Sequence, residues 1–83
     1  MNDIENRLIE IVDLFVNGLN LDLRQKIILN KALHIIMSHS QQAITFISSV
    51  EDEFTIEFED EEISLDVFLN FDLIVGLIKK HFD

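Results

Sequence analysis

The stretch "MSHSQQAITFISSVEDEF", residues 37–54, places two serines and a histidine immediately before an amphipathic helix. Ser40 and His39 are the residue types of a nucleophile and its base. Neighbouring residues on a helix point about 100° apart, so this pair does not face each other as a catalytic pair must. The chain also lacks the Gly-x-Ser-x-Gly turn that presents a nucleophilic serine. The spacing therefore argues against hydrolase chemistry.

Metal binding is also disfavoured by spacing. His34 and His39 are five residues apart, which fits neither the i, i+3 nor the i, i+4 geometry of a helical metal pair, and His81 is remote in sequence. The acidic run "EDEFTIEFEDEE", residues 51–62, lacks the Asp-x-Asp-x-Asp-Gly loop that turns oxygens toward calcium. We expect structural histidines and no dedicated metal site.

Two interpretations of Ser40 stay open from the residues alone. A serine at a helix start is ordinarily a cap. An exposed hydroxyl there could equally carry a phosphodiester, because free backbone N–H groups and the helix dipole stabilise negative charge at this position. The second interpretation would suit a covalent, phosphate-linked prosthetic arm.

Composition predicts one domain spanning residues 1–83. The 83 residues are 48% apolar and include seven phenylalanines, enough for a compact core. Cysteine is absent, so the chain has no disulfide and no thiolate nucleophile, which fits a cytoplasmic location. No signal peptide or membrane-spanning segment is recognisable in the sequence.

The net charge of −10 is unevenly distributed. Residues 1–50 hold five acids and four bases, whereas residues 51–83 hold eleven acids and two lysines. The negative electrostatic potential of residues 51–83 repels nucleic acid and anionic membranes and attracts basic protein surfaces. The same acidic region could also act simply as a solvated face that keeps a small protein in solution.

Apolar periodicity predicts the helices that position Ser40. The first helix spans residues 3–17, with Asn2 and Glu5 as a capping box and Gly18 as the residue that ends it. Residues 19–37 fit no clean helical period, so we expect a short helix near 22–29, capped by Asp22, and an irregular buried segment. The predicted inner stripe of the first helix is Ile4, Leu8, Ile11, Val12 and Phe15.

The second clear helix begins at residues 38–40, where Ser38 and Gln41 form a second capping box. Beyond Phe54 we expect an extended loop, a short helix near 60–68, and a last helix capped by Asn70. The result is an all-α fold, a four-helix bundle with a long loop between its first two helices. The inner stripes are Ile44, Ile47, Val50 and Phe54, and then Phe71, Ile74, Val75, Ile78 and Phe82.

Two stretches resemble the acyl carrier protein family. Those small acidic four-helix proteins carry 4′-phosphopantetheine on a serine at the start of their second helix. "VEDEFTIEFEDEE", residues 50–62, is similar to the family stretch that ends this helix, and "FLNFDLIVGLIKK", residues 68–80, is similar to the final-helix pattern. Counting back from Phe54 reaches the family's modified serine at Ser40 without a gap.

The sequence departs from the family around that serine. His39 stands where the family usually has Asp, Gln41 replaces the usual Leu, and "QQAITFISS" carries no acids on the first turns of the helix. These departures indicate a specialised member that serves its own dedicated enzymes.

The resemblance implies a carrier that is not itself an enzyme. Ser40 would hold 4′-phosphopantetheine, whose thiol carries an acyl or aminoacyl group as a thioester in fatty acid, secondary lipid or polyketide biosynthesis. His39 and Gln41 would shape the recognition surface. The implied partners are a phosphopantetheinyl transferase and acyl-activating, synthase or acyltransferase enzymes with basic docking surfaces, which Glu51, Asp52 and Glu53 would attract. We expect a monomer.

An alternative is an unmodified interaction module of the same fold. In that case Ser40 is a plain helix cap, and the acidic residues 51–66 bind a basic protein partner.

Overall fold

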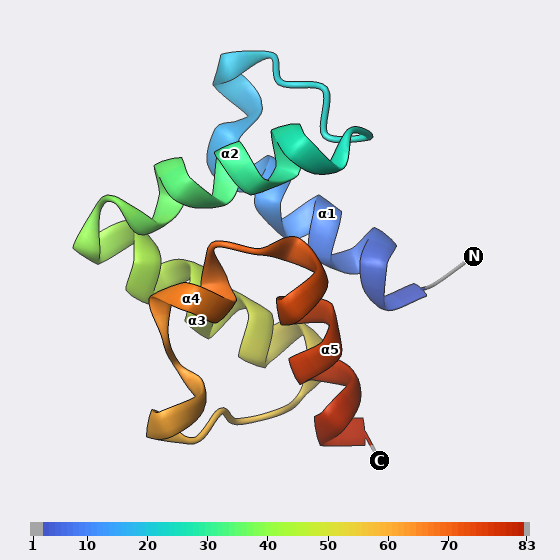
Figure 1. Cartoon of the computed structure of the whole chain (residues 1–83), viewed down its shortest axis with the longest axis vertical. Helices are drawn as coiled ribbons and strands as arrows, with labels where there is room; N and C mark the ends of the chain where they lie inside the picture. Colours follow the sequence, from blue (N-terminus) through green and yellow to red (C-terminus); the bar gives the residue numbers. More distant parts are fainter. Residues whose placement is uncertain (1–2, 83) are drawn as a thin grey trace.

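The computed structural model describes residues 3–82, and these form an all-α fold, as predicted (Figure 1). Five α-helices and two 3₁₀ turns pack into a body of 34 × 31 × 20 Å. No strand occurs within the described residues. In chain order the elements are α1 Asp3–Val16, η1 Asn17–Leu19, α2 Lys26–Met37, α3 Ser40–Phe54, η2 Asp60–Glu62, α4 Leu65–Phe68 and α5 Phe71–Phe82.

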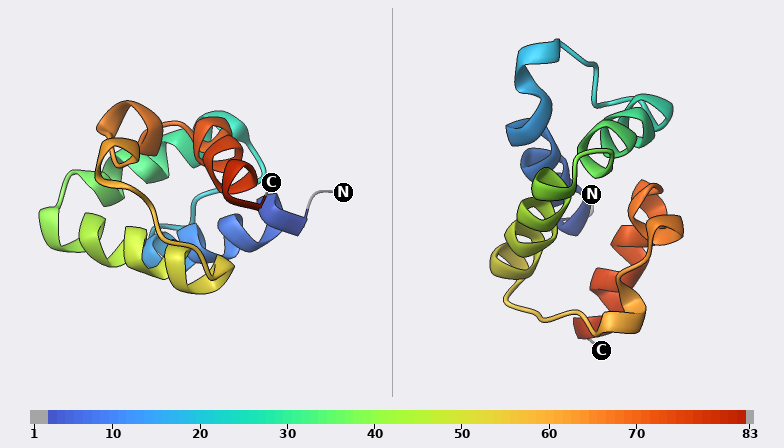
Figure 2. Two further views of the ribbon diagram at one scale, coloured as in Figure 1. Left: turned by 90° about the horizontal axis from the view of Figure 1, so that it is seen from below. Right: turned by 90° about the vertical axis from the view of Figure 1, so that its left-hand side faces the viewer.

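The helix α1 is the central element, because it packs against α2, α3 and α5 (Figures 1 and 2). Three of its buried residues belong to the predicted stripe, whereas Ile4 and Phe15 are only partly buried and Val16 was not predicted. The buried residues of α1 are Leu8, Ile11, Val12 and Val16. The predicted cap Asn2 lies outside the described residues.

The end of α1 differs from the prediction. The helix stops at Val16 and continues as the turn η1, and Gly18 does not have the positive φ of a helix-ending residue. Asn20 takes that conformation instead, with φ 55° and ψ 44°. Asparagine tolerates the left-handed region better than most residues, so the chain reverses two residues later than predicted.

The helix α2 corrects the prediction for residues 19–37. The chain is helical from Lys26 to Met37, where we expected a short helix near 22–29 and an irregular segment. The buried residues have an i, i+3, i+4, i+7 spacing, which the adjacent isoleucines obscured. Ile27 belongs to that run but is 67% exposed. The buried residues are Leu29, Ala32, Leu33 and Ile36.

The helix α3 begins at Ser40, within the predicted range, but its predicted capping box is absent. Ser38 Oγ donates a hydrogen bond to the carbonyl of Ile35, 2.7 Å away, and so closes the end of α2. His39 is the N-cap residue, with extended backbone and no side-chain capping bond. Ser38 therefore serves the preceding helix and leaves the start of α3 uncapped.

The buried face of α3 is rotated from the predicted one. Ile44, expected in the core, is 66% exposed, whereas Phe46 is fully buried. Phe46 packs edge-to-face on Phe15 of α1, with ring centroids 5.6 Å apart. That aromatic contact, together with buried Val50 and Phe54, determines which face of α3 lies against α1.

The C-terminus of α3 is a Schellman motif built on a β-branched residue. The amide of Thr55 donates to the carbonyl of Asp52 at 3.4 Å, and the amide of Ile56 donates to that of Glu51 at 3.0 Å. Thr55 has φ 54° and ψ 50°, a region in which a Cβ substituent is strained.

Replacing Thr55 by glycine should therefore stabilise the protein. We expect Thr55→Gly to raise the free energy of unfolding by about 1 kcal/mol, because relief of the strained conformation exceeds the added chain entropy. Urea denaturation measures the change. Thr45→Gly, inside α3, should instead destabilise by about 0.5 kcal/mol, the difference between the helix propensities of threonine and glycine. Equal destabilisation by both changes would contradict the strain argument.

A non-helical segment, residues 56–59, follows the turn at Thr55, as predicted, and it buries Phe58 against Phe68. The expected helix over residues 60–68 is split into η2 and α4. Ser64 separates the two, and its Oγ caps α4 by accepting from the amide of Val67 at 3.4 Å. Because α4 has only four residues, packing rather than helix propensity must hold it.

The helix α5 has two caps at its N-terminus. Asn70 Oδ1 accepts from the amide of Leu73 at 3.2 Å, which confirms the predicted cap. Asn30 Oδ1, on α2, accepts from the amide of Phe71 at 2.9 Å. Lys26 Nζ also reaches Asp72 Oδ1 at 2.6 Å, so α2 holds the start of α5 at two points.

The predicted inner stripe of α5 is confirmed except at its end. Phe71, Ile74, Val75 and Ile78 are buried, whereas Phe82 is 52% exposed.

Removing the tertiary cap should loosen the attachment of α5. We expect Asn30→Ala to lower the free energy of unfolding by about 1 kcal/mol, because the Phe71 amide loses its partner in a half-buried position. Lys31→Ala, an exposed neighbour on the same helix, should change it by less than about 0.5 kcal/mol. Thermal denaturation of both variants measures these changes in the free energy of unfolding. Similar changes in the two variants would rule out the proposed capping role.

Candidate functional site

The sequence-predicted site residues His39, Ser40 and Gln41 lie together at the turn between α2 and α3. This turn forms one extremity of the molecule, at the left of Figure 1. All three residues are exposed, and Ser40 is the first residue of α3. Only Ser38 and His39 separate the two helices, so the turn is tight.

The backbone around Ser40 is available to an anion. Within residues 3–82, no hydrogen bond engages the N–H groups of Ser40, Gln41 or Gln42, and the first bond of the helix runs from Ala43 to His39 at 2.8 Å. No side chain caps this helix. A helix of fifteen residues with free first-turn N–H groups favours negative charge at its start. The Ser40 hydroxyl therefore lies where an attached phosphate would be stabilised.

The predicted partner-binding acids lie at the other end of α3, about 16 Å along the helix axis from Ser40. Glu51 Oε2 accepts from the amide of Phe58 at 2.8 Å and so holds the segment after α3. Glu53 Oε2 accepts from Arg7 Nε at 2.8 Å. Only Asp52 is exposed with no side-chain partner among the described residues. Two of the three predicted steering acids thus have intramolecular partners.

Arg7 joins α1 to the C-terminus of α3. Its guanidinium donates to the side chain and to the carbonyl of Glu53, and it lies 4.5 Å from the centroid of the Phe54 ring. The hydrogen bond that Arg7 donates to the Glu53 carboxylate is the main reason that the pKa of Arg7 is raised above its usual value. Sequence reasoning missed Arg7, because its partner is far away in the chain.

Glu62 is the centre of a second internal cluster. Its carboxylate accepts from the Glu59 amide at 2.8 Å, from His81 Nε2 at 2.9 Å and from Lys80 Nζ at 3.4 Å. The ring of His81 packs edge-to-face on Phe58. The Glu59 amide first, and then His81, lower the pKa of Glu62 below its ordinary value. The cluster ties η2 to the end of α5.

This cluster predicts a pH-dependent contribution to stability. Because the pKa of Glu62 is lowered in the folded state, its contribution is present above the ordinary value of 4.5 and is lost as the pH falls through the lowered value. Glu62→Gln should therefore be less stable than the wild type at neutral pH, and the difference should shrink as the pH falls through the lowered pKa of Glu62.

Denaturant unfolding across that pH range tests the prediction. Glu61→Gln, the exposed neighbour, is the control and should follow the wild-type curve. A constant stability difference between Glu62→Gln and the wild type at every pH would contradict it.

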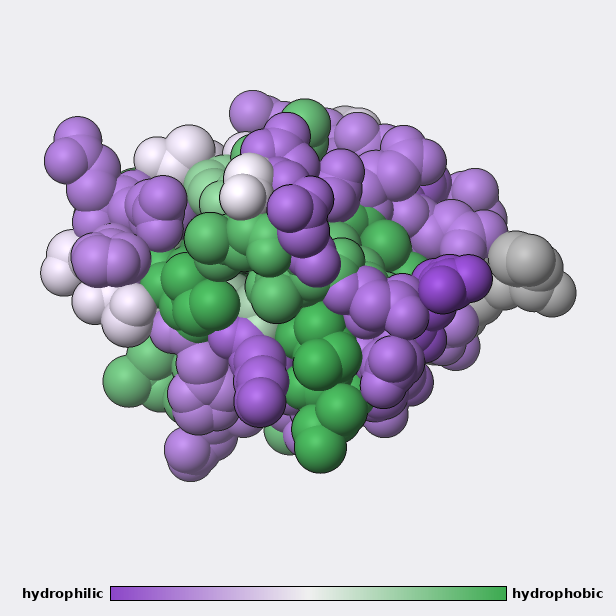
Figure 3. Space-filling model, turned by 90° about the horizontal axis from the view of Figure 1, so that it is seen from above, coloured by the Kyte–Doolittle hydropathy of each residue, from purple (hydrophilic) through white to green (hydrophobic). Residues whose placement is uncertain are grey.

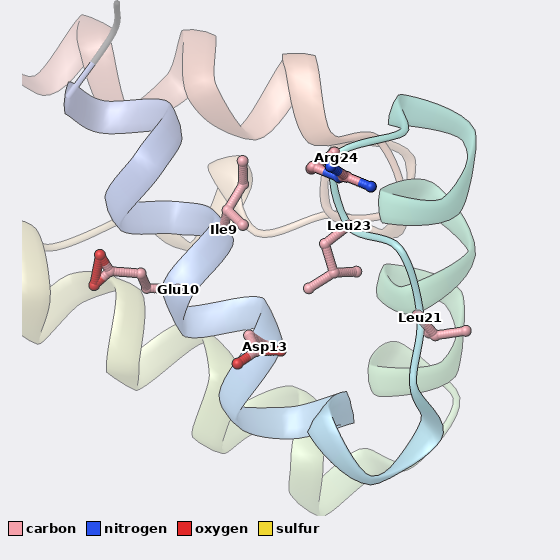
Figure 4. A pocket seen from close by; sticks show the side chains of 6 residues that line it. All are labelled: Ile9, Glu10, Asp13, Leu21, Leu23 and Arg24. Carbon is pink, nitrogen blue, oxygen red and sulfur yellow. The ribbon is translucent and has the colours of Figure 1, made fainter.

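A pocket of about 340 Å³ lies away from Ser40, between α1 and the connection that leads to α2 (Figure 4). Sequence reasoning did not find it, because the connection was expected to be partly helical and its distance from α1 was unknown. Its lining residues are Ile9, Glu10, Asp13, Leu21, Leu23 and Arg24.

Within residues 3–82, no group of three or more His, Cys, Asp or Glu side chains is placed to hold a metal ion. None of the described helices combines the length and apolarity needed to cross a membrane. No protein-family model matches the chain, and comparison with curated proteins and with solved structures also finds no match.

Proposed function

We propose that this protein is a specialised acyl or aminoacyl carrier that bears 4′-phosphopantetheine on Ser40. The observation that supports this most is the exposed Ser40 hydroxyl at the first position of an uncapped fifteen-residue helix. The free N–H groups there would stabilise the phosphodiester of the arm. The arm would supply a thiol to a chain that contains no cysteine.

The order of the helices is compatible with this proposal. In the proposed correspondence, α1, α3, α4 and α5 take the places of the four carrier helices. The helix α2 then replaces the long first loop that the family resemblance led us to expect. The difference would move the recognition surface, since the end of α2 lies directly beside Ser40.

The proposed partners are a phosphopantetheinyl transferase and acyl-activating, synthase or acyltransferase enzymes. His39 and Gln41 are exposed on either side of Ser40, and the transferase would recognise their side chains. Asp52 would contribute to the attraction of basic partner surfaces, while Glu51 and Glu53 stabilise the helix that carries the serine.

Intact mass spectrometry after co-expression with a broad-specificity phosphopantetheinyl transferase tests the proposal. The wild type should gain the mass of one phosphopantetheine group, and Ser40→Ala should gain none. Ser38→Ala is the matched control and should still be modified, because the Ser38 hydroxyl is bonded to the carbonyl of Ile35. An unmodified wild type, or an adduct that persists in Ser40→Ala, would overturn the proposal.

A second candidate function is an unmodified interaction module, and the exposed acids favour it. Several acids in residues 52–66 have no ion pair within residues 3–82 and would attract a basic protein. Ser40→Ala would then leave cellular function intact, whereas loss of function in that variant would favour the carrier. These acids are Asp52, Glu57, Asp60, Glu61 and Asp66.

A further inference from the structure

The pocket beside α1 is lined by apolar and charged residues from two segments. Ile9, Glu10 and Asp13 come from α1, and Leu21, Leu23 and Arg24 come from the connection opposite (Figure 4). Leu23 is only 8% exposed and is part of the core, whereas Ile9 and Leu21 are half-buried. An apolar side chain entering the pocket would therefore meet apolar surface on both sides.

The free charge around this pocket is negative. Glu10 and Asp13 are exposed, and neither carboxylate has a hydrogen bond or ion pair within residues 3–82. Arg24, the one cation of the lining, is paired with Asp22, with Nε and Oδ1 2.9 Å apart. Hydrogen bonds from Arg24 and then Gln25 lower the pKa of Asp22 to about 2, so both groups of this pair are charged across the physiological pH range. Figure 4 shows the Glu10 side chain on the side of α1 away from the connection, so a cationic partner must cover the pocket and cross α1 to meet both carboxylates.

Exposed apolar side chains also occur on α1 and η1 outside the pocket lining. Leu14, on α1, is 72% exposed, and Leu19, in η1, is 54% exposed. Figure 3 looks down on the side formed by η1, the connection and α2, and shows a hydrophobic area bordered by hydrophilic residues. A protein segment that lay over the pocket and this hydrophobic area would cover more apolar surface than a small molecule confined to the pocket.

We propose that the pocket is a docking site for a partner-protein segment that carries an apolar anchor side chain flanked by lysine or arginine. The anchor enters between Ile9, Leu21 and Leu23. The flanking cations lie against Glu10 and Asp13 on the α1 wall, where their charges are complementary. This surface is separate from Ser40, so the proposal does not depend on modification of that serine.

Titration of the ¹⁵N-labelled protein with three short peptides tests the proposal by NMR. The probe is acetyl-Lys-Leu-Leu-Lys-amide, and the controls are acetyl-Lys-Ser-Ser-Lys-amide and acetyl-Glu-Leu-Leu-Glu-amide. The probe should produce saturable shifts centred on residues 9–24 at millimolar concentration, and each control should bind at least several-fold more weakly. Ser40→Ala should respond as the wild type does, which separates this site from the carrier proposal.

Charge variants locate the cationic contacts. Glu10→Gln with Asp13→Asn should weaken probe binding about three- to tenfold, as expected for the loss of two exposed ion pairs. Glu57→Gln with Asp60→Asn changes the net charge equally at exposed acids elsewhere and should leave binding unchanged. The proposal is overturned by shifts centred on residues 51–62, by equal binding of the serine peptide, by no shifts at all, or by equal effects of the two variant pairs.

Discussion

The packing of α1 against three other helices is the contact on which the rest of the fold depends. The helix α3 packs chiefly on α1 and α2, and α2 in turn contacts α4 and α5, so α1 and α2 together join the two halves of the chain. Leu8 and Val12 are fully buried at the centre of this arrangement. In a domain of 83 residues there is little other apolar surface to share, so the buried faces of α1, α2, α3 and α5 meet in one core.

The helix α2 connects that core to the candidate site. Its inner face packs on α1, and Asn30 and Lys26 hold the start of α5. At its other end only two residues precede α3, and Ser38 is used to close α2. This sharing leaves the first N–H groups of α3 unpaired and Ser40 exposed. The proposed attachment point is thus a consequence of how two consecutive helices are joined.

The acidic character of the chain has two physical roles. Glu51, Glu53 and Glu62 accept hydrogen bonds that hold loops and helix ends in place. Other carboxylates, such as Asp52 on α3 and Asp13 on α1, remain exposed and set the field that a partner meets. Residue type alone cannot separate these roles, because an Asp or Glu in a charged run looks the same whether or not a distant arginine or amide reaches it.

The sequence by itself determined the all-α class, the stripe of α1, the start of α3 near Ser40 and the cap at Asn70. Each of these depends on local spacing or on a side chain that bonds within its own turn. The tertiary structure decided what depends on distant contacts. The contact of Phe15 with Phe46 helps to determine which face of α3 is buried. Residues 26–37 form a helix that packs on α1, although adjacent isoleucines obscure the helical period in their sequence.

The bonds of Asn30 and Arg7, and the pocket beside α1, likewise join residues whose proximity is created only by folding. The amino-acid sequence does not directly show which distant residues lie close together in the folded protein. Local periodicity could therefore place Ser40 at a helix start, while the surfaces around it depended on how the helices pack.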